Sequence, residues 1–433
     1  MNSHKTLAAP AGAALPECLA YGENGLTLDG VSLKVIAQEF GTPVYVYSAK
    51  TLLDRFHAYQ NALIGKKGLI CYAVKANAGI ALLKRLAQAG SGFDIVSAGE
   101  LACALKAGAD PKKIVYSGVG KRKDEIEAAL AAGIKSFNIE SAQELDRIAE
   151  IARALGKKAP ISVRINPNVD AKTHPKISTG LKENKFGVAL PDCLALYRKA
   201  ASDPHLEPVG IDCHIGSQIT RIGPFMEAAR SVIEFALTLK KEGIKVSHLD
   251  FGGGLGVRYT EEDAVLSPET LITGTRNLSE AAELGDLELI FEPGRSVVAD
   301  SGILLTKAEY IKTAPDRNFL IVDASMTEMV RVAMYGADMP LVPVSEEKGR
   351  ARLPYDVVGP VCESSDTFRK GEVLPEAAQG DLYVILRAGA YGFSMASSYN
   401  MRALPPEVLV EDGKAFLIRQ KAPLEDLWRN QIF

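Results

Sequence analysis

The fold of this chain is decided by residues 114–165, which read IVYSGVGKRKDEIEAALAAGIKSFNIESAQELDRIAEIARALGKKAPISVRI. The stretch contains three short apolar runs: Ile114–Tyr116, Ser136–Ile139 and Ile161–Ile165. Such runs are typical of buried strands. Between them, Asp124–Ala132 and Ala142–Leu155 have helical periodicity, and Gly133 and Gly156 follow as residues that can end a helix. The segment therefore predicts consecutive strand–helix units.

The same alternation extends from about residue 66 to residue 295. The expected strands are centred on Leu69–Tyr72, Phe93–Val96, Ile114–Tyr116, Ser136–Ile139, Ile161–Ile165, Val209–Asp212, His248–Phe251 and Leu289–Phe291. Eight successive strand–helix units favour an α/β fold with a closed, TIM-like (β/α)8 barrel of parallel strands. An open, doubly wound sheet is the alternative.

After about residue 300 the pattern changes to strands without intervening helices. The expected strands are Gly302–Tyr310, Phe319–Val322, Tyr355–Val358 and Leu382–Leu386. Val408–Ile418 reads as a hairpin whose turn is Asp412-Gly413. The strand-like segment Gly25–Gly30 is expected to join this all-β domain. The predicted organisation is a disordered lead-in (1–20), an N-terminal segment of the β domain (21–44), the barrel (45–300) and the C-terminal β domain (301–433).

Composition and charge exclude several classes of protein. The 433 residues are 47% hydrophobic and 24% charged, which is typical of a globular protein. The formal net charge of −3 argues against a nucleic-acid partner, and no apolar stretch approaches the ~20 residues that span a bilayer. The six cysteines are far apart and form no C-x-x-C pair, which argues against a zinc ribbon or a disulfide framework. Because no secretory signal is recognisable, we expect a cytoplasmic protein. We also expect that it binds no metal.

Residues with chemical potential follow several of the predicted strands, where barrel enzymes place their active sites. Lys75 follows the first strand, His214 the sixth, Gly252–Gly254 the seventh and Glu292 the eighth. Each residue also has an ordinary explanation: a surface lysine, a structural histidine, a tight turn and a surface Glu–Arg pair. Arg164–Asn166 ends the fifth strand, with no role assigned.

Together, these residues match what pyridoxal 5′-phosphate needs from a protein. The cofactor requires an amine for a Schiff base, donors for its phosphate, a side chain against its ring, and an anion that keeps the pyridine nitrogen protonated. The barrel mouth would supply all four.

The β domain adds further candidates. Cys362 lies in Gly359–Asp366 and is either an inert thiol or the proton donor to a carbanion. Tyr391 is flanked by glycines, in a segment that could equally be a packed turn. Arg331 and Tyr335 are four residues apart, so they share a face if that segment is helical.

These motifs resemble the diaminopimelate decarboxylases, within the fold-type III pyridoxal-phosphate enzymes that also include ornithine and arginine decarboxylases and alanine racemase. The resemblance covers nearly the whole chain after about residue 20. The stretches that carry it are Tyr72–Asn77, His214–Gln218, Gly252–Gly254, Glu292–Arg295, Gly359–Asp366, Ala390–Gly392, Thr173–Gly180 and Lys185–Gly187. One departure is Gly336–Pro340, where many family members have an aromatic residue and a histidine.

The resemblance implies a role for each candidate residue. Lys75 would form the Schiff base, His214 would stack on the cofactor ring, and Glu292 would pair with the pyridinium nitrogen. The implied phosphate-binding residues are Gly253, Gly254, Gly294 and Arg295, with Ser217 as a further candidate. Cys362 would protonate the product carbanion. The implied substrate- or cofactor-binding residues are Arg295, Arg331, Tyr335, Glu363 and Tyr391.

The resemblance also implies an activity, a small-molecule amino-acid substrate and an assembly. The reaction would be decarboxylation of meso-2,6-diaminopimelate to L-lysine and CO2, the last step of lysine biosynthesis. The assembly would be a homodimer in which Cys362 and Tyr391 of one copy face Lys75 of the other. The alternatives are a decarboxylase of ornithine, arginine or a carboxy-polyamine, alanine racemase, and a non-catalytic regulatory relative.

Overall fold

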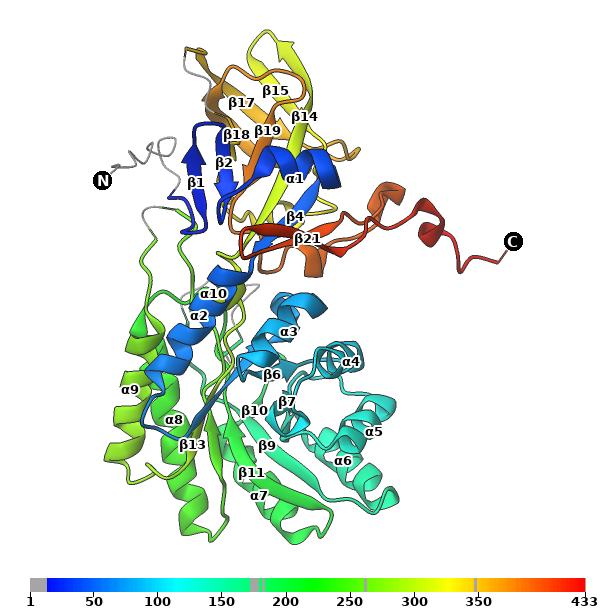
Figure 1. Ribbon diagram of the computed structural model, residues 1–433. Coiled ribbons are helices and arrows are strands. Elements are labelled where there is room, and N and C mark those ends of the chain that lie inside the picture. The colour runs from blue at the N-terminus through cyan, green and yellow to red at the C-terminus, as the bar shows by residue number, and fades with distance from the viewer. Residues whose placement is uncertain (1–13, 172–178, 181–183, 261–262, 346–348, 433) are drawn as a thin grey trace. The chain divides into compact units, whose positions relative to one another are not determined.

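The computed structural model describes residues 14–171, 179–180, 184–260, 263–345 and 349–432. The described chain divides into two compact units. A barrel unit contains Leu53–Val257 and Ala264–Val297, and a β unit contains the described parts of Met1–Leu52, Arg258–Asp263 and Val298–Phe433. Figure 1 shows the path of the chain through both.

The barrel unit is a closed ring of parallel strands. Its eight strands are β5 (Gly68–Ala73), β6 (Gly92–Ile95), β7 (Ile114–Tyr116), β8 (Ser136–Ile139), β9 (Ala159–Asn166), β11 (Leu206–Asp212), β12 (His248–Asp250) and β13 (Glu288–Phe291). Neighbours pair in this order, and the pairing of β13 with β5 closes the ring. A short strand, β10 (Val188–Ala189), pairs with β9. The predicted closed barrel is confirmed, and the open sheet is excluded.

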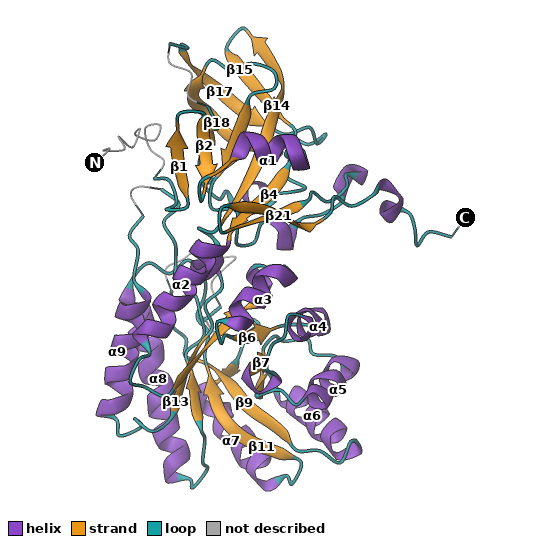
Figure 2. Cartoon of the chain, viewed as in Figure 1, coloured by secondary structure: helices purple, strands orange, loops and turns teal. Residues whose placement is uncertain are grey.

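Helices surround the barrel strands (Figure 2). They are α2 (Ala49–Ala62), which begins in the β unit, α3 (Ile80–Gln88), α4 (Ala98–Lys106), α5 (Lys123–Ala132), α6 (Ala142–Ala154), α7 (Leu190–Ser202), α8 (Ile222–Lys241), α9 (Pro268–Ala281) and α10 (Arg295–Val298), which runs into the β unit, with short 3-10 turns at η1 (Val74–Ala76) and η2 (Pro111–Lys113). Serines begin α4, α6 and α9 by accepting a hydrogen bond from a backbone N–H three residues later. As predicted, Gly133 adopts the left-handed conformation after α5, with φ of 71°.

The β unit contains a nine-stranded sheet and a three-stranded sheet. The larger sheet contains β4 (Val44–Ser48), β14 (Gly302–Ala314), β15 (Arg317–Val322), β16 (Leu341–Pro343), β17 (Arg352–Val358), β18 (Thr367–Pro375), β19 (Leu382–Ile385), β20 (Glu407–Glu411) and β21 (Lys414–Arg419). The smaller sheet contains β1 (Leu19–Gly22), β2 (Gly25–Leu28) and β3 (Val31–Ser32). The helices are α1 (Leu33–Phe40), α11 (Arg331–Tyr335), η4 (Phe393–Met395), η5 (Tyr399–Met401) and η6 (Leu424–Leu427).

The predicted hairpin is present in the β unit. Strands β20 and β21 are antiparallel, and Glu411 pairs with Lys414 across the turn. Asp412 and Gly413 both have positive φ, at 49° and 70°, as the tight turn requires.

Two segments differ from the predicted domain boundaries. The predicted barrel began at residue 45, yet β4 pairs with β14 and β20 in the β unit, where all five of its residues are buried. β1 begins within the predicted lead-in, and Cys18 and Leu19 are buried in the core of the β unit. Residues 1–13 lie outside the described part of the chain.

Candidate active site

Lys75 lies at the mouth of the barrel, in the short turn η1 that follows β5. Its Nζ atom is 2.5 Å from Oδ2 of Asp94, a fully buried residue of β6. The lysine side chain keeps a third of its surface exposed. The ion pair therefore holds a partly exposed lysine at a defined place at the barrel mouth.

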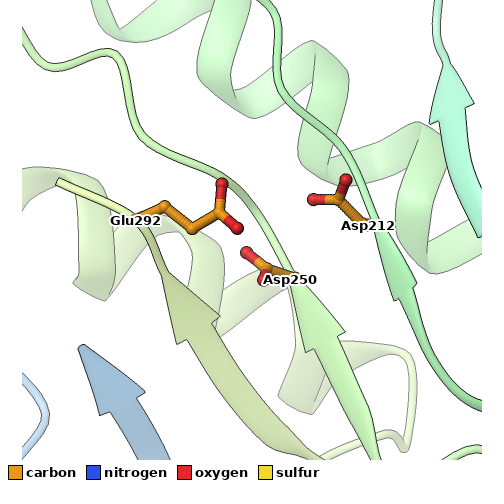
Figure 3. A group of neighbouring side chains, drawn as sticks. All are labelled: Asp212, Asp250 and Glu292. Atoms are coloured by element: carbon orange, nitrogen blue, oxygen red, sulfur yellow. The ribbon is translucent and has the colours of Figure 1, made fainter. Parts of the chain in front are cut away.

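Three further carboxylates meet beside this pair. Asp212, Asp250 and Glu292 lie at the carboxyl ends of β11, β12 and β13, and each contributes an oxygen within 4.8 Å of the others. Figure 3 shows the three side chains pointing toward one another from adjacent strands. All three are buried, so their charges have little solvent to stabilise them.

Burial dominates the electrostatics of this acidic cluster, by which we mean Asp212, Asp250 and Glu292. It raises the pKa of Asp212 to about 7, against the opposing effect of the Arg164 guanidinium. Burial, followed by the charges of the neighbouring carboxylates, also raises the pKa of Glu292 and of Asp250 well above their usual values. The cluster therefore favours a proton or a cation among its oxygens.

The hydrogen bonding points the same way. Among the described residues, one oxygen each of Asp94, Asp212, Asp250 and Glu292 is buried without a hydrogen-bond partner. Buried acceptors of this kind normally have a donor. Three clustered carboxylates could hold a metal ion, and the single acceptor Oε1 of Glu292 also suits a ring nitrogen that carries a proton.

His214 is fixed from both its backbone and its ring. Its carbonyl oxygen accepts hydrogen bonds from Nη2 of Arg164 at 3.2 Å and from Oγ1 of Thr179 at 3.0 Å. Its Nδ1 accepts a hydrogen bond from the N–H of Gly253 at 3.2 Å. Burial, with help from the positive charges of Arg164 and Lys75, lowers the pKa of His214 well below its usual value. The ring is therefore a neutral imidazole, and the hydrogen bond to Nδ1 limits its orientation.

Arg164 and Glu140 form a layer behind His214 that the sequence did not reveal. Their side chains pair at 2.8 Å, and both are buried. Glu140 also accepts hydrogen bonds from the N–H groups of Gly118 and Gly187, at 3.2 Å and 2.6 Å. The Phe186 ring lies 5.0 Å from the Arg164 guanidinium carbon. This layer ties Lys185–Gly187 to the barrel mouth; residues 173–178 of the other quoted stretch lie outside the described residues.

The predicted phosphate-binding turns lie against one another. A Cβ atom at Gly253 would be 2.0 Å from the carbonyl oxygen of Glu292, and one at Gly254 would be 2.4 Å from that of Gly216. Only glycine permits this approach. Nε and Nη2 of Arg295 donate to Oγ of Ser217, both at 3.2 Å. The turns after β11, β12 and β13 thus gather Gly253, Gly254, Ser217, Gly294 and Arg295, although the Gly253 N–H already bonds to His214.

Arg331 and Tyr335 belong to the β unit, and the segment that holds them is helical, because both lie in the short helix α11. The Arg331 guanidinium is buried, with its carbon 5.0 Å from the centre of the Tyr259 ring. Its Nη1 donates to the carbonyl oxygen of Ala390 at 3.4 Å, next to Tyr391. Arg331 therefore links the segment around Tyr259 to the one around Tyr391.

The departure at Gly336–Pro340 has defined contacts within the β unit. Asp338 forms an ion pair with Arg369. Met339 is buried, and its sulfur lies 3.6 Å from Nη1 of Arg331. A thioether thus contacts the predicted substrate-binding arginine.

Cys362 and Glu363 lie on the loop between β17 and β18, and Cys362 is exposed. Asp366 holds this loop, because its carboxylate accepts hydrogen bonds from the N–H groups of Val361 at 2.8 Å and Met326 at 2.6 Å. Burial raises the pKa of Asp366. The loop therefore carries a thiol and a carboxylate next to a segment that the Asp366 hydrogen bonds hold in place.

The structure brings the barrel candidates together and adds residues that sequence reasoning missed. Lys75, His214, Ser217, Glu292 and Arg295 all belong to the mouth of the barrel unit. The missed residues are Asp94, Glu140, Asp212 and Asp250, whereas Arg164 was noted without a role. A usable signal existed for two of them, since Asp212 and Asp250 are charged residues that end apolar strands.

Comparison with known proteins gives consistent matches. Residues 49–299 match the family model described as pyridoxal-dependent decarboxylase, pyridoxal binding domain. The chain is 46% identical to a diaminopimelate decarboxylase of Pseudomonas aeruginosa over 96% of this chain and 99% of that protein. It is 48% identical to the Vibrio cholerae protein of the same name, over 94% and 97% of the two chains.

Solved structures agree with the sequence matches. The diaminopimelate decarboxylase of Helicobacter pylori complexed with L-lysine superposes with a TM-score of 0.88 at 46% identity, over 92% of this chain and 98% of that one. The M. jannaschi diaminopimelate decarboxylase gives a TM-score of 0.92 at 38% identity, over 96% and 98% of the two chains. In the described part of this chain, no helix combines the length and the apolar character that crossing a membrane requires.

Proposed function

Because this chain belongs to the diaminopimelate decarboxylase family of pyridoxal-dependent decarboxylases, we propose that it removes one carboxylate of meso-2,6-diaminopimelate. The carboxylate would leave from the D-centre, and the products would be L-lysine and CO2, as the last step of lysine biosynthesis. The observation that carries the proposal is that one barrel mouth holds both a partly exposed lysine, Lys75, and a buried acceptor without a donor, Oε1 of Glu292.

The barrel mouth fits pyridoxal phosphate, the cofactor of the family. Lys75 would bind the aldehyde, and His214 would lie against the ring. Glu292 would accept a hydrogen bond from the protonated ring nitrogen. The phosphate would be held by Gly253, Gly254, Gly294, Arg295 and Ser217, with Tyr391 as a further contact. When bound, the cofactor supplies an electron sink for the electron pair that remains when CO2 departs.

Glu292 would maintain that sink by keeping a positive charge beside it. Its carboxylate is buried among Asp250, Asp212 and Asp94, so it is costly to ionise alone. A cationic donor at Oε1 would offset both the desolvation and the repulsion among the carboxylates. The excess of buried acids over bases at this mouth therefore favours a cationic ring.

His214 would act as a positioned neutral face. Its lowered pKa keeps the ring uncharged, and its bond to Gly253 fixes the ring plane. A charged imidazole next to a cationic cofactor would be repelled. Cys362 would then deliver the proton from Sγ to Cα of the product, where the carboxylate was lost.

Substrate selection would use the charges of the distal L-centre. A guanidinium, from Arg295 or Arg331, would pair with the distal carboxylate, and Glu363 would pair with the distal ammonium. Tyr335 and Tyr391 would line the pocket. Ornithine and lysine lack the distal carboxylate, so they would leave that guanidinium unpaired.

The functional protein would be a cytoplasmic homodimer with shared sites, in which the β unit of one copy completes the barrel mouth of the other. Large apolar side chains are exposed in the last part of the chain, at Tyr399, Met401, Phe416, Leu417 and Trp428. These exposed apolar side chains are candidates for contacts between the two copies.

Mixing two inactive variants tests the shared site. Lys75→Ala and Cys362→Ala dimers, unfolded and refolded together in equal amounts, should regain about a quarter of the intact sites, because half of the dimers become hybrids with one complete site. If the mixture stays as inactive as its components while wild-type protein refolds with activity, each copy must build its own site.

The substrate is tested by assaying purified holoprotein with meso-diaminopimelate, ornithine, arginine and lysine at equal concentrations. We expect L-lysine and CO2 from meso-diaminopimelate, at a kcat/KM at least about 100-fold above that for ornithine, the cost of an unpaired buried charge. Product identity would be read by mass spectrometry. Faster turnover of ornithine would assign the protein to a different decarboxylase activity.

A further inference from the structure

Tyr399 and Asn400, adjacent residues of η5, contact the two candidate functional residues of the β17–β18 loop. Oδ1 of Asn400 accepts a hydrogen bond from the N–H of Cys362 at 3.3 Å. The Tyr399 hydroxyl is hydrogen-bonded to the Glu363 carboxylate. Two consecutive side chains therefore hold two consecutive residues, one bearing the thiol and the other the carboxylate.

The backbone of η5 is unusual at the same place. Asn400 has φ of 54° and ψ of 27°, and Met401 has φ of 55°. Left-handed conformations are uncommon for residues other than glycine, and two in succession are rarer still. Strained backbone of this kind clusters at functional sites, where the surrounding structure enforces it. Here the conformation directs the Asn400 amide to the Cys362 backbone.

The loop and η5 are anchored to the same stretch of chain, residues 323–328, which follows β15. Nη2 of Arg402, directly after η5, donates to the carbonyl oxygen of Asp323 at 2.7 Å. The N–H of Met326 donates to Oδ1 of Asp366 at 2.6 Å. A common anchor fixes the distance between the two segments, so the contacts of Asn400 and Tyr399 can set the orientation of the loop tip.

We propose that Asn400 and Tyr399 are positioning residues that act through the loop tip. Asn400 holds the Cys362 backbone so that the thiol points to the carbon it protonates, and Tyr399 orients Glu363 toward the distal ammonium of the substrate. This inference rests on the proposed function, because it takes the roles of Cys362 and Glu363 from there.

The two residues are expected to affect different kinetic constants. The thiol acts in the chemical sequence after substrate is bound, so its misplacement lowers kcat. The Glu363 carboxylate contacts an unreacting part of the substrate, so its loss of orientation raises KM. The hydrogen bond to Glu363 also raises the pKa of Tyr399.

The test compares Asn400→Ala, Asn400→Asp and Tyr399→Phe in the holoenzyme. The aspartate variant retains an oxygen that can accept the Cys362 N–H, whereas the alanine variant does not. We expect N400A to lower kcat about tenfold with KM within about twofold, N400D to stay within about threefold of wild type, and Y399F to raise KM about fivefold. The matched controls are N430A and Y310F, because in the described part of the chain both side chains are exposed and form no side-chain hydrogen bond or ion pair.

A second measurement follows Cys362 directly. Iodoacetamide labelling, read by mass spectrometry of the Cys362 peptide, reports how the thiol is presented, and Cys362→Ala provides the blank. We expect N400A to change the labelling rate at least about threefold, the scale of one lost hydrogen bond, and N400D to leave it near wild type. The thermal midpoints of the variants should lie close to that of wild type.

Two results would overturn the inference. In the first, N400A has the kcat and the Cys362 labelling rate of wild type. In the second, N400A and N400D lower kcat equally and both also lower the thermal midpoint. Wild-type KM in Y399F would remove Tyr399 from it. The proposed function fails separately, if wild-type protein does not decarboxylate diaminopimelate or if Cys362→Ala keeps full turnover. In that case the labelling rates still decide whether Asn400 positions the thiol.

Discussion

The barrel unit and the β unit hold their candidate functional groups in opposite ways. In the barrel, Asp212, Asp250 and Glu292 are buried at strand ends. In the β unit, Cys362 and Glu363 are exposed on a loop that hydrogen bonds hold in place. Substitutions in the barrel should therefore change charge balance, whereas substitutions near the loop should change position.

Lys75→Ala is the strongest way to break the barrel side of this comparison. It removes the amine and leaves Asp94 buried without its cation, so we expect turnover to fall by roughly 10⁴-fold or more, as when a covalent nucleophile is lost. Borohydride reduction of wild-type holoprotein should attach the cofactor to the peptide containing position 75, and mass spectrometry would show it. Label at another lysine would assign the amine elsewhere.

Cys362→Ala tests the loop side. The loss of a general acid typically costs 10²–10⁴-fold, and we expect turnover to fall by about 10³-fold. The absorption spectrum and the cofactor content should remain those of wild type, because no barrel residue has changed. A variant with an unchanged rate would exclude Cys362 from proton transfer.

Glu292→Gln keeps the size of the side chain and removes its charge. We expect turnover to fall by about 10²-fold, the scale of losing one fixed electrostatic group, together with a shifted cofactor absorption band. The Glu363→Gln variant provides the contrast, since it should raise KM for diaminopimelate without altering that band. A wild-type spectrum and rate in the Glu292 variant would contradict the pairing with the ring nitrogen.

The pH dependence of stability should reveal the buried acids in cofactor-free protein. The pKa of Asp212 is about 7 in the folded chain, against 3.8 for an ordinary aspartate. Between these values the folded state keeps a proton that the unfolded state has released, so this group makes the unfolding free energy decrease as pH rises from about 4 to 7. Above about pH 7 both states have released this proton, so the group no longer changes the unfolding free energy with pH.

Asp212→Asn should remove that contribution, so its stability relative to wild type should increase with pH. Urea unfolding at pH 5, 6, 7 and 8 measures the trend. Asp286→Asn, at an exposed aspartate, is the control for the substitution itself. A relative stability of the Asp212 variant that is flat with pH would mean that this carboxyl is ionised throughout the range.

Regular patterns made the barrel strands predictable. β5 to β9 and β11 to β13 coincide with apolar runs, because a strand buried on both faces needs apolar residues throughout. The predicted boundary at residue 45 left β4 on the barrel side, and its Val-Tyr-Val-Tyr run does not by itself distinguish the two units. Its hydrogen-bonded neighbours, not its composition, place it in the β unit.

The site was predictable where a residue stands directly after a strand and has distinctive chemistry. Lys75, His214 and Glu292 met both conditions. Asp94 did not, because it lies within β6, and its role depends on the lysine that follows the preceding strand, β5. Arg164 was visible as a residue, but its role follows from its contacts with Glu140 and with the His214 carbonyl oxygen, which no spacing in the sequence encodes.

By itself, the sequence determined the order of the strand–helix units, the closed parallel barrel and the chemical groups at its mouth. These follow from local periodicity and from the rule that parallel strands end at one face. Only the tertiary structure decided which carboxylates share a buried space, how far their pKa values rise, and which residues clamp the Cys362 loop. Those properties depend on distances and desolvation between groups far apart along the chain, and such quantities exist only after the chain has folded.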